Sequence, residues 1–195
     1  MPWNPIRRRR RTGPGGRTTR HPPDGLLPAD AEARLAEEPN EWMYVYAPAG
    51  RRRGRFEGTP DNVDLSADFM RFTDDAPPRS VLRDHLVVHN HPPTLGPHAV
   101  ASYPPSPRDL ALMVDRDLRE FVVVSGRYRY AVGRPGEHWI GDEGLYRDEL
   151  DAIRATLAVE IGPAAPTAAG AAARQHLILE RLRARGWIDY ERTAR

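Results

Sequence analysis

The chain has 195 residues, of which 39% are hydrophobic and 29% are charged, a balance typical of one globular domain with appendages. It contains no cysteine, and its 29 basic residues are all arginine. This composition excludes disulfides, Cys-held zinc and every reaction that needs a catalytic lysine. No uninterrupted run of about 18 apolar residues occurs, so we expect no transmembrane helix and no membrane partner.

The first 28 residues form an arginine-rich segment. Arg7 to Arg11 is an unbroken basic run, and Asp24 is the first acidic residue. A segment with so few apolar side chains cannot form a core, so residues 1–28 are expected to be a disordered arm that makes weak, salt-sensitive contact with nucleic acid at most. No apolar stretch follows the basic run, so a signal peptide is not indicated and a cytoplasmic location is expected.

The segment after the arm predicts a helix and a β-hairpin. Alanine, leucine and acidic residues alternate from Ala29 to Glu38, and Pro39 ends that helical pattern. Two strands are then expected over Trp42–Ala47 and Arg53–Glu57. The intervening Pro48-Ala49-Gly50 is typical of a tight turn between paired strands.

The middle of the chain predicts further strands with a helix between them. A buried strand is expected at the apolar run Leu86-Val87-Val88. Ser106 is a favourable N-cap and Pro107 suits the first helical position, so a helix is expected to begin there. Phe121–Ser125 and Tyr128–Val132 predict a second hairpin around a Ser-Gly turn.

The C-terminal third predicts two helices. Apolar residues recur at helical spacing after Trp139 and again over Ala168–Arg185, with Gly162-Pro163 between the two stretches. The fold class expected is therefore α/β, a single domain with a mixed sheet from Trp42 to Val132 and helices packed on it. The expected segments are the arm at 1–28, the α/β domain at 29–140 and a C-terminal helical extension at 141–195.

The most informative motif is His89-Asn90-His91. It follows the apolar strand, and the period-2 geometry of a strand places both imidazoles on one face, where they can share a metal. Asp109 lies one helical turn after Ser106, so these two side chains are expected to face the same way. His89, His91 and Asp109 would give a metal three protein ligands and leave a fourth position open for water, as in catalytic zinc sites. For Asp109, stabilisation of the helix dipole is the alternative role.

A hydrolytic site of this kind also needs a general base and a hydrogen-bond donor for the developing oxyanion. Glu57 is the expected base, because it ends a strand where a carboxylate can project into a cleft. Ser106 is the expected donor. Glu41 precedes a strand and Glu37 and Glu38 lie on an exposed helix, so these three are weaker candidates.

These residues resemble the JAB/MPN metalloproteases, whose JAMM motif is a distant Glu, then His-x-His, then Ser-x-x-Asp. Glu57, His89, His91, Ser106 and Asp109 stand in that order, and the local sequences are similar to the prokaryotic, RadC-like branch and to small domains of phage and toxin systems. The resemblance covers Trp42 to about Trp139. It implies that the histidines and Asp109 bind Zn²⁺, that Glu57 deprotonates water and that Ser106 stabilises the tetrahedral intermediate of amide hydrolysis.

One feature departs from the family pattern. The family places seven residues between the second histidine and the serine, whereas residues 92–105 provide fourteen here. This enlarged loop carries His98, which we expect to be a solvent-exposed loop histidine and not a further ligand. His85 lies four residues before His89 and is expected to be structural.

Three functions are compatible with this pattern. The favoured one is a zinc-dependent peptidase or isopeptidase acting on a protein or peptide, including conjugates of a ubiquitin-like modifier. The second is a catalytically inactive JAB-type module that binds a protein through the same groove. The third is a RadC-like protein or nuclease acting on or near DNA, although Pro92 and Pro93 follow the motif directly and prevent the helix that an HNH nuclease requires.

Overall fold

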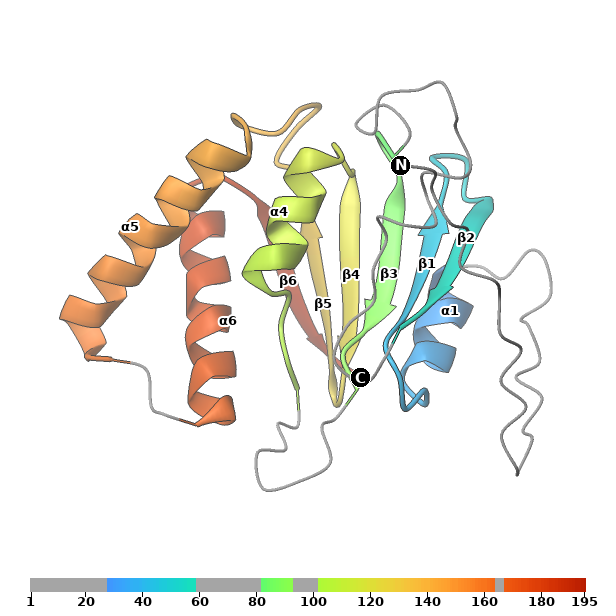
Figure 1. The fold of residues 1–195 in the computed structure, drawn as a ribbon, viewed down its shortest axis with the longest axis horizontal. Coiled ribbons are helices and arrows are strands. Elements are labelled where there is room, and N and C mark those ends of the chain that lie inside the picture. Colours follow the sequence, from blue (N-terminus) through green and yellow to red (C-terminus); the bar gives the residue numbers. More distant parts are fainter. Residues whose placement is uncertain (1–27, 59–81, 93–101, 164–166) are drawn as a thin grey trace, which may run out of the picture.

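The computed structural model describes residues 28–58, 82–92, 102–163 and 167–195, which form a six-stranded mixed sheet with helices on both faces (Figure 1). This architecture confirms the expected α/β class. The expected arm lies outside the described residues except for Pro28, and so does His98. Within the described ranges, each helix is too short or too polar to cross a bilayer.

The first described elements are a helix and a hairpin, as predicted. α1 spans Pro28–Leu35, and β1 (Trp42–Tyr46) pairs antiparallel with β2 (Arg52–Glu57). The turn between the strands contains Gly50 at a φ of 79°, a left-handed conformation that glycine adopts without steric cost.

The centre of the sheet is a parallel pair joined by a helix. β3 (Leu86–Asn90) lies between β1, to which it is antiparallel, and β4 (Glu120–Ser125), to which it is parallel. α4 (Pro107–Asp115) forms the crossover between β3 and β4. β5 (Tyr128–Gly133) then returns antiparallel along β4. The carboxyl ends of β3 and β4 therefore meet at one edge of the sheet, the lower end in Figure 1.

The C-terminal part contributes two helices and one more strand. α5 (Glu143–Ile161) and α6 (Ala168–Ala184) confirm the two predicted helices. β6 (Asp189–Ala194) was not predicted, and it pairs antiparallel with β5 at the edge of the sheet. The sheet therefore extends beyond the expected limit of Val132, in the order β2-β1-β3-β4-β5-β6.

Each face of the sheet has its own apolar core. One face packs against α4, α5 and α6 through side chains that include Met43, Val87 and Phe121. The opposite face packs against α1 through the alternate side chains of the same strands, among them Trp42 and Val88. Any strand residue can therefore be assigned to the α4 face or to the α1 face by counting from these positions.

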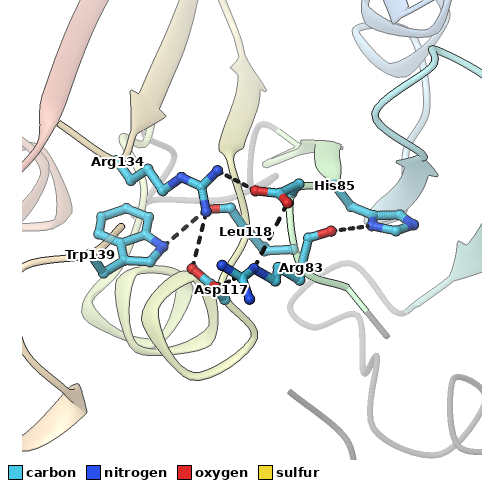
Figure 2. A network of polar contacts seen from close by, with 7 residues as sticks. Arg83, His85, Asp117, Leu118, Arg134 and Trp139 are labelled. Atoms are coloured by element: carbon cyan, nitrogen blue, oxygen red, sulfur yellow. Dashed lines mark hydrogen bonds and ion pairs between the residues drawn. The ribbon is translucent and has the colours of Figure 1, made fainter. Parts of the chain in front are cut away.

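Ion pairs between Arg134, Asp117 and Asp84, here called the charged clip, lie at the end of the sheet away from the carboxyl ends of β3 and β4 (Figure 2). The Arg134 guanidinium donates to Asp117, at 3.2 Å, and to Asp84. Both aspartates have left-handed backbone, with φ of 52° and 63°, and they lie just after α4 and just before β3. In the same turn the His85 ring contacts the Arg83 carbonyl through Nδ1 at 2.9 Å.

Candidate metal centre

The two histidines of the motif lie at the carboxyl end of β3, on the α4 face. His89 pairs in register with Met43 of β1 and Val123 of β4, and its side chain is 2% exposed. His91 follows the strand directly, and its amide still donates to the Val124 carbonyl at 2.9 Å. The two ring centroids lie 4.5 Å apart. The strand geometry therefore brings both imidazoles together, as its period predicts.

The first turn of α4 brings Asp109 to the histidines. Ser106 is the N-cap, and a reciprocal pair of bonds fixes the turn: the Asp109 amide donates to Ser106 Oγ at 3.2 Å and the Ser106 amide donates to Asp109 Oδ2 at 2.6 Å. Asp109 Oδ2 lies 3.7 Å from His91 Nε2. One ligand atom from each of His89, His91 and Asp109 lies within 4.8 Å of the others.

His89 differs from the other two residues of the triad because its ring nitrogens make no hydrogen bond to the described residues. Both of its ring nitrogens are buried and neither has a hydrogen-bond partner among the described residues. Phe121 packs edge-on against the ring with centroids 4.9 Å apart. Burial, and to a lesser extent the charge of His91, hold the pKa of the His89 imidazole well below its usual range. The ring is therefore neutral near pH 7 and retains a lone pair, which is the form that binds a metal.

The tautomer of His91 is fixed by a backbone carbonyl. His91 Nδ1 lies 3.2 Å from the Tyr103 oxygen. A carbonyl can only accept, so Nδ1 carries a hydrogen, and Nε2, which faces Asp109, is the nitrogen through which His91 would bind a metal. Metal-binding histidines are held by this kind of contact through their second nitrogen.

The triad can hold a metal ion. Two ligands bound to tetrahedral Zn²⁺ at the usual bond lengths lie about 3.4 Å apart, close to the 3.7 Å between His91 Nε2 and Asp109 Oδ2. The uncompensated nitrogens of His89 fit the same interpretation, since buried polar groups are normally paired. Two imidazoles and one carboxylate are ligands that suit zinc and other divalent transition metals.

Glu57, the base expected from the sequence, is not brought to this triad. It pairs with Trp42, and Arg55, two residues earlier, stacks on the Trp42 ring at 3.8 Å from its centroid. Trp42 belongs to the core on the α1 face, whereas Phe56, the residue before Glu57, belongs to the core on the α4 face. Strand alternation therefore places Glu57 on the side of the sheet opposite to the histidines.

Strand alternation assigns Glu41, rather than Glu57, to the face of the sheet that carries the histidines. Glu41 precedes Met43 by two residues, and its carbonyl accepts from the Gly58 amide at 2.8 Å, which shows that the β1–β2 pairing continues through this position. It therefore shares the α4 face with Met43. Extending the Met43 to His89 register by two residues places Glu41 opposite His91. The sequence does show that Glu41 lies two residues before Met43, the spacing of side chains on one face of a strand. This spacing identifies the face only when the partners of Met43 in the sheet are known.

Asn90 joins the histidine motif to the segment that carries Glu41. Its side chain is buried on the opposite face from the two imidazoles. Asn90 Oδ1 accepts from the Trp42 amide at 2.7 Å, and Nδ2 donates to the Asn40 carbonyl at 3.0 Å and to the Glu38 carbonyl at 3.3 Å. The amide thus fixes the backbone on both sides of Glu41.

The chain was compared with protein-family models, with curated proteins and with solved structures, and none of the three comparisons found a match.

Proposed function

We propose that this protein is a zinc-dependent peptidase or isopeptidase of the JAB/MPN kind, which hydrolyses an amide bond with metal-activated water. The observation that carries the proposal is the convergence of His89, His91 and Asp109 from a strand end and a helix start that the βαβ crossover brings together. Zinc bound there would lower the pKa of a coordinated water and polarise the scissile carbonyl.

The chain itself supplies the acid–base groups. Glu41, on the same face as the histidines, accepts a proton as a water oxygen attacks the carbonyl carbon, and it returns that proton to the amide nitrogen as the C–N bond breaks. The Ser106 oxygen accepts a hydrogen bond from the Asp109 amide. The hydroxyl hydrogen of Ser106 is therefore available to donate to the developing oxyanion. Ser106 and Asp109 are thereby held in one rigid turn.

The substrate that fits this chemistry is a protein or peptide, with conjugates of a ubiquitin-like modifier as one form of it. The other functions are tested by the same measurements. A protein-binding module would contain zinc without hydrolysing amides, and a protein acting on DNA would cleave a plasmid and leave a fluorogenic peptide fusion intact.

The test compares two glutamates on opposite faces of one hairpin. Glu41→Gln is expected to retain about one zinc per chain by elemental analysis and to lower the hydrolysis of a fluorogenic peptide or ubiquitin-like fusion by roughly 10²–10⁴-fold, since the amide cannot accept the proton. Glu57→Gln is the matched control and is expected to hydrolyse the fusion at the wild-type rate.

Two results would contradict the proposal. Equal metal content in the wild type and in a His89→Ala, His91→Ala double variant would show that the triad is not the metal site. Loss of hydrolysis in Glu57→Gln with full activity in Glu41→Gln would show that the assignment of the base from the strand register is wrong.

A further inference from the structure

A buried hydroxyl next to the metal centre takes no part in the proposed chemistry. Ser125 is the last residue of β4 and is 2% exposed. It shares the α4 face with Phe121 and Val123, and it follows the residue whose carbonyl receives the His91 amide. Ser125 therefore lies beside His91 at the carboxyl edge of the parallel pair.

The Ser125 side chain connects two segments that meet at His91. Its Oγ donates to the His91 carbonyl at 3.2 Å and accepts from the Tyr103 amide at 2.6 Å. The carbonyl of Tyr103, which lies twelve residues after His91 in the chain, accepts the Nδ1 hydrogen of His91 at 3.2 Å. One hydroxyl thus holds both the backbone of the ligand and the carbonyl that orients the ligand's ring.

The neighbouring contacts hold this arrangement in place. Ser102 Oγ donates to the Ser125 carbonyl at 2.6 Å. Since that uses the only hydroxyl hydrogen of Ser102, the Tyr130 hydroxyl 2.8 Å away must be the donor to Ser102 Oγ. On the other side, Gln175 of α6 donates to the Pro105 carbonyl at 2.8 Å. The segment that precedes α4 is therefore tied to the sheet and to α6.

We infer that Ser125 is a positioning residue for the metal ligand His91: it fixes the Tyr103 carbonyl that selects the ring tautomer and rotation in which Nε2 faces Asp109. The inference rests on the proposed metal site. Side chains that orient metal ligands without touching the ion typically contribute 10- to 100-fold to metal affinity. Because Tyr103 acts through its backbone, the serine that holds it is the side chain through which this effect can be tested.

The test measures Zn²⁺ affinity of the full chain by competition with a chromophoric chelator. Ser125→Ala is expected to weaken Zn²⁺ binding by about 10- to 100-fold, and Ser125→Thr, which keeps the hydroxyl, is expected to restore most of it. Tyr146→Phe is the matched control. It removes another buried hydroxyl that donates to a carbonyl, that of Trp187, in α5 and away from the triad. It is expected to leave Zn²⁺ affinity unchanged.

Four outcomes would overturn the inference. Zinc affinity of Ser125→Ala within about twofold of the wild type would show that the Ser125 hydrogen bonds do not orient His91. An equal loss of zinc affinity in Tyr146→Phe would show that the effect is only one of stability. Wild-type protein that binds no Zn²⁺ would refute the metal site itself, and the inference with it. If Ser125→Ala does not fold, Ser102→Ala can replace it, because it removes a hydrogen bond that holds the same segment to Ser125. Unchanged zinc affinity in Ser102→Ala would then count against the inference.

Discussion

His89 combines two properties that conflict in a protein without metal. Its ring is almost fully buried against Phe121 and strand side chains, yet both nitrogens lack a hydrogen-bond partner among the described residues. A buried polar group left unpaired costs about 1–3 kcal/mol of stability. Coordination of a metal at the proposed site would offset this cost.

The conflict predicts that an apolar residue at this position stabilises the apoprotein. His89→Leu is expected to raise the free energy of unfolding in EDTA by about 1–2 kcal/mol, since the unpaired nitrogens are removed from the core. The same variant should lose metal binding. Urea denaturation and zinc titration measure the two effects.

His91→Leu is the control for that prediction. His91 is partly exposed, and its Nδ1 is already bonded to Tyr103, so the variant should lose metal without gaining stability. A His89→Leu apoprotein less stable than the wild type would mean that the His89 nitrogens are paired in solution.

Asn90 is expected to act on hydrolysis through Glu41. Asn90→Ala leaves the Trp42 amide and the Asn40 carbonyl without their partner, so the backbone around Glu41 is released while both histidines remain. We expect zinc content to be retained and hydrolysis of the fusion to fall. In a Glu41→Gln background the same substitution should cause little further loss, because residues that act as one unit are not additive. Full additivity in this double-mutant cycle would show that Asn90 does not act through Glu41.

At the level of elements, the start of α4 has two roles that mutation can separate. Ser106→Ala removes the N-cap and is expected to lower the free energy of unfolding by about 1 kcal/mol. Asp109→Asn keeps an oxygen that can accept from the Ser106 amide but loses the negative charge, so it should weaken zinc binding more than it lowers stability. Thermal unfolding and chelator competition on both variants distinguish the roles. Equal zinc affinity in Asp109→Asn and the wild type would remove Asp109 from the ligand set.

The elements that carry strong local signals were predictable from the sequence. The turn around Gly50, the cap and proline at the start of α4 and the apolar run of β3 each specify their structure within a few residues. β6 carries no such signal: of its residues only Tyr190 is buried, because it is an edge strand with one side facing solvent. Its sequence therefore lacks the alternation that identifies a strand.

The candidate site shows the same division between local and non-local information. The histidine pair and the Ser-x-x-Asp turn are local patterns, and the structure brings them together. The choice between Glu41 and Glu57 depends on the face of the sheet, and the face depends on pairing with Met43 and Trp42. A shift of one residue in a strand exchanges its two faces, so a candidate chosen by its position at a strand end can lie on the wrong side.

In the whole molecule, the candidate centre lies at the carboxyl ends of a parallel pair of strands, with the charged clip of Arg134 at the other end. Open α/β sheets place their ligand sites outside the carboxyl ends of parallel strands, where the crossover helix begins. Here that helix start supplies Asp109 and Ser106, and the strand end supplies both histidines. The topology thus brings candidate metal-binding side chains from two distant segments together, and none of these side chains is long.

Packing of α6 on β6 predicts how stability depends on pH. Burial lowers the pKa of His176, the charge of Arg192 lowers it further and Glu180 opposes the change. Its Nδ1 lies 2.7 Å from the Tyr190 hydroxyl, a bond that the neutral ring can accept. The folded state therefore binds fewer protons than the unfolded state below the ordinary histidine pKa of about 6.5. The contribution to stability is complete above that pH and is lost as the pH falls from there toward the folded-state pKa.

His176→Gln is expected to reduce this pH dependence. Urea denaturation of metal-free wild type and variant at pH 7.5, 6.0 and 5.0 should show the wild type losing more stability on acidification than the variant. Burial also lowers the pKa of His89, but this residue is present in both proteins, so the difference between the two curves isolates His176. Parallel curves over this range would show that His176 titrates alike in the folded and unfolded chains, and that the contact between α6 and β6 does not exclude its protonated form.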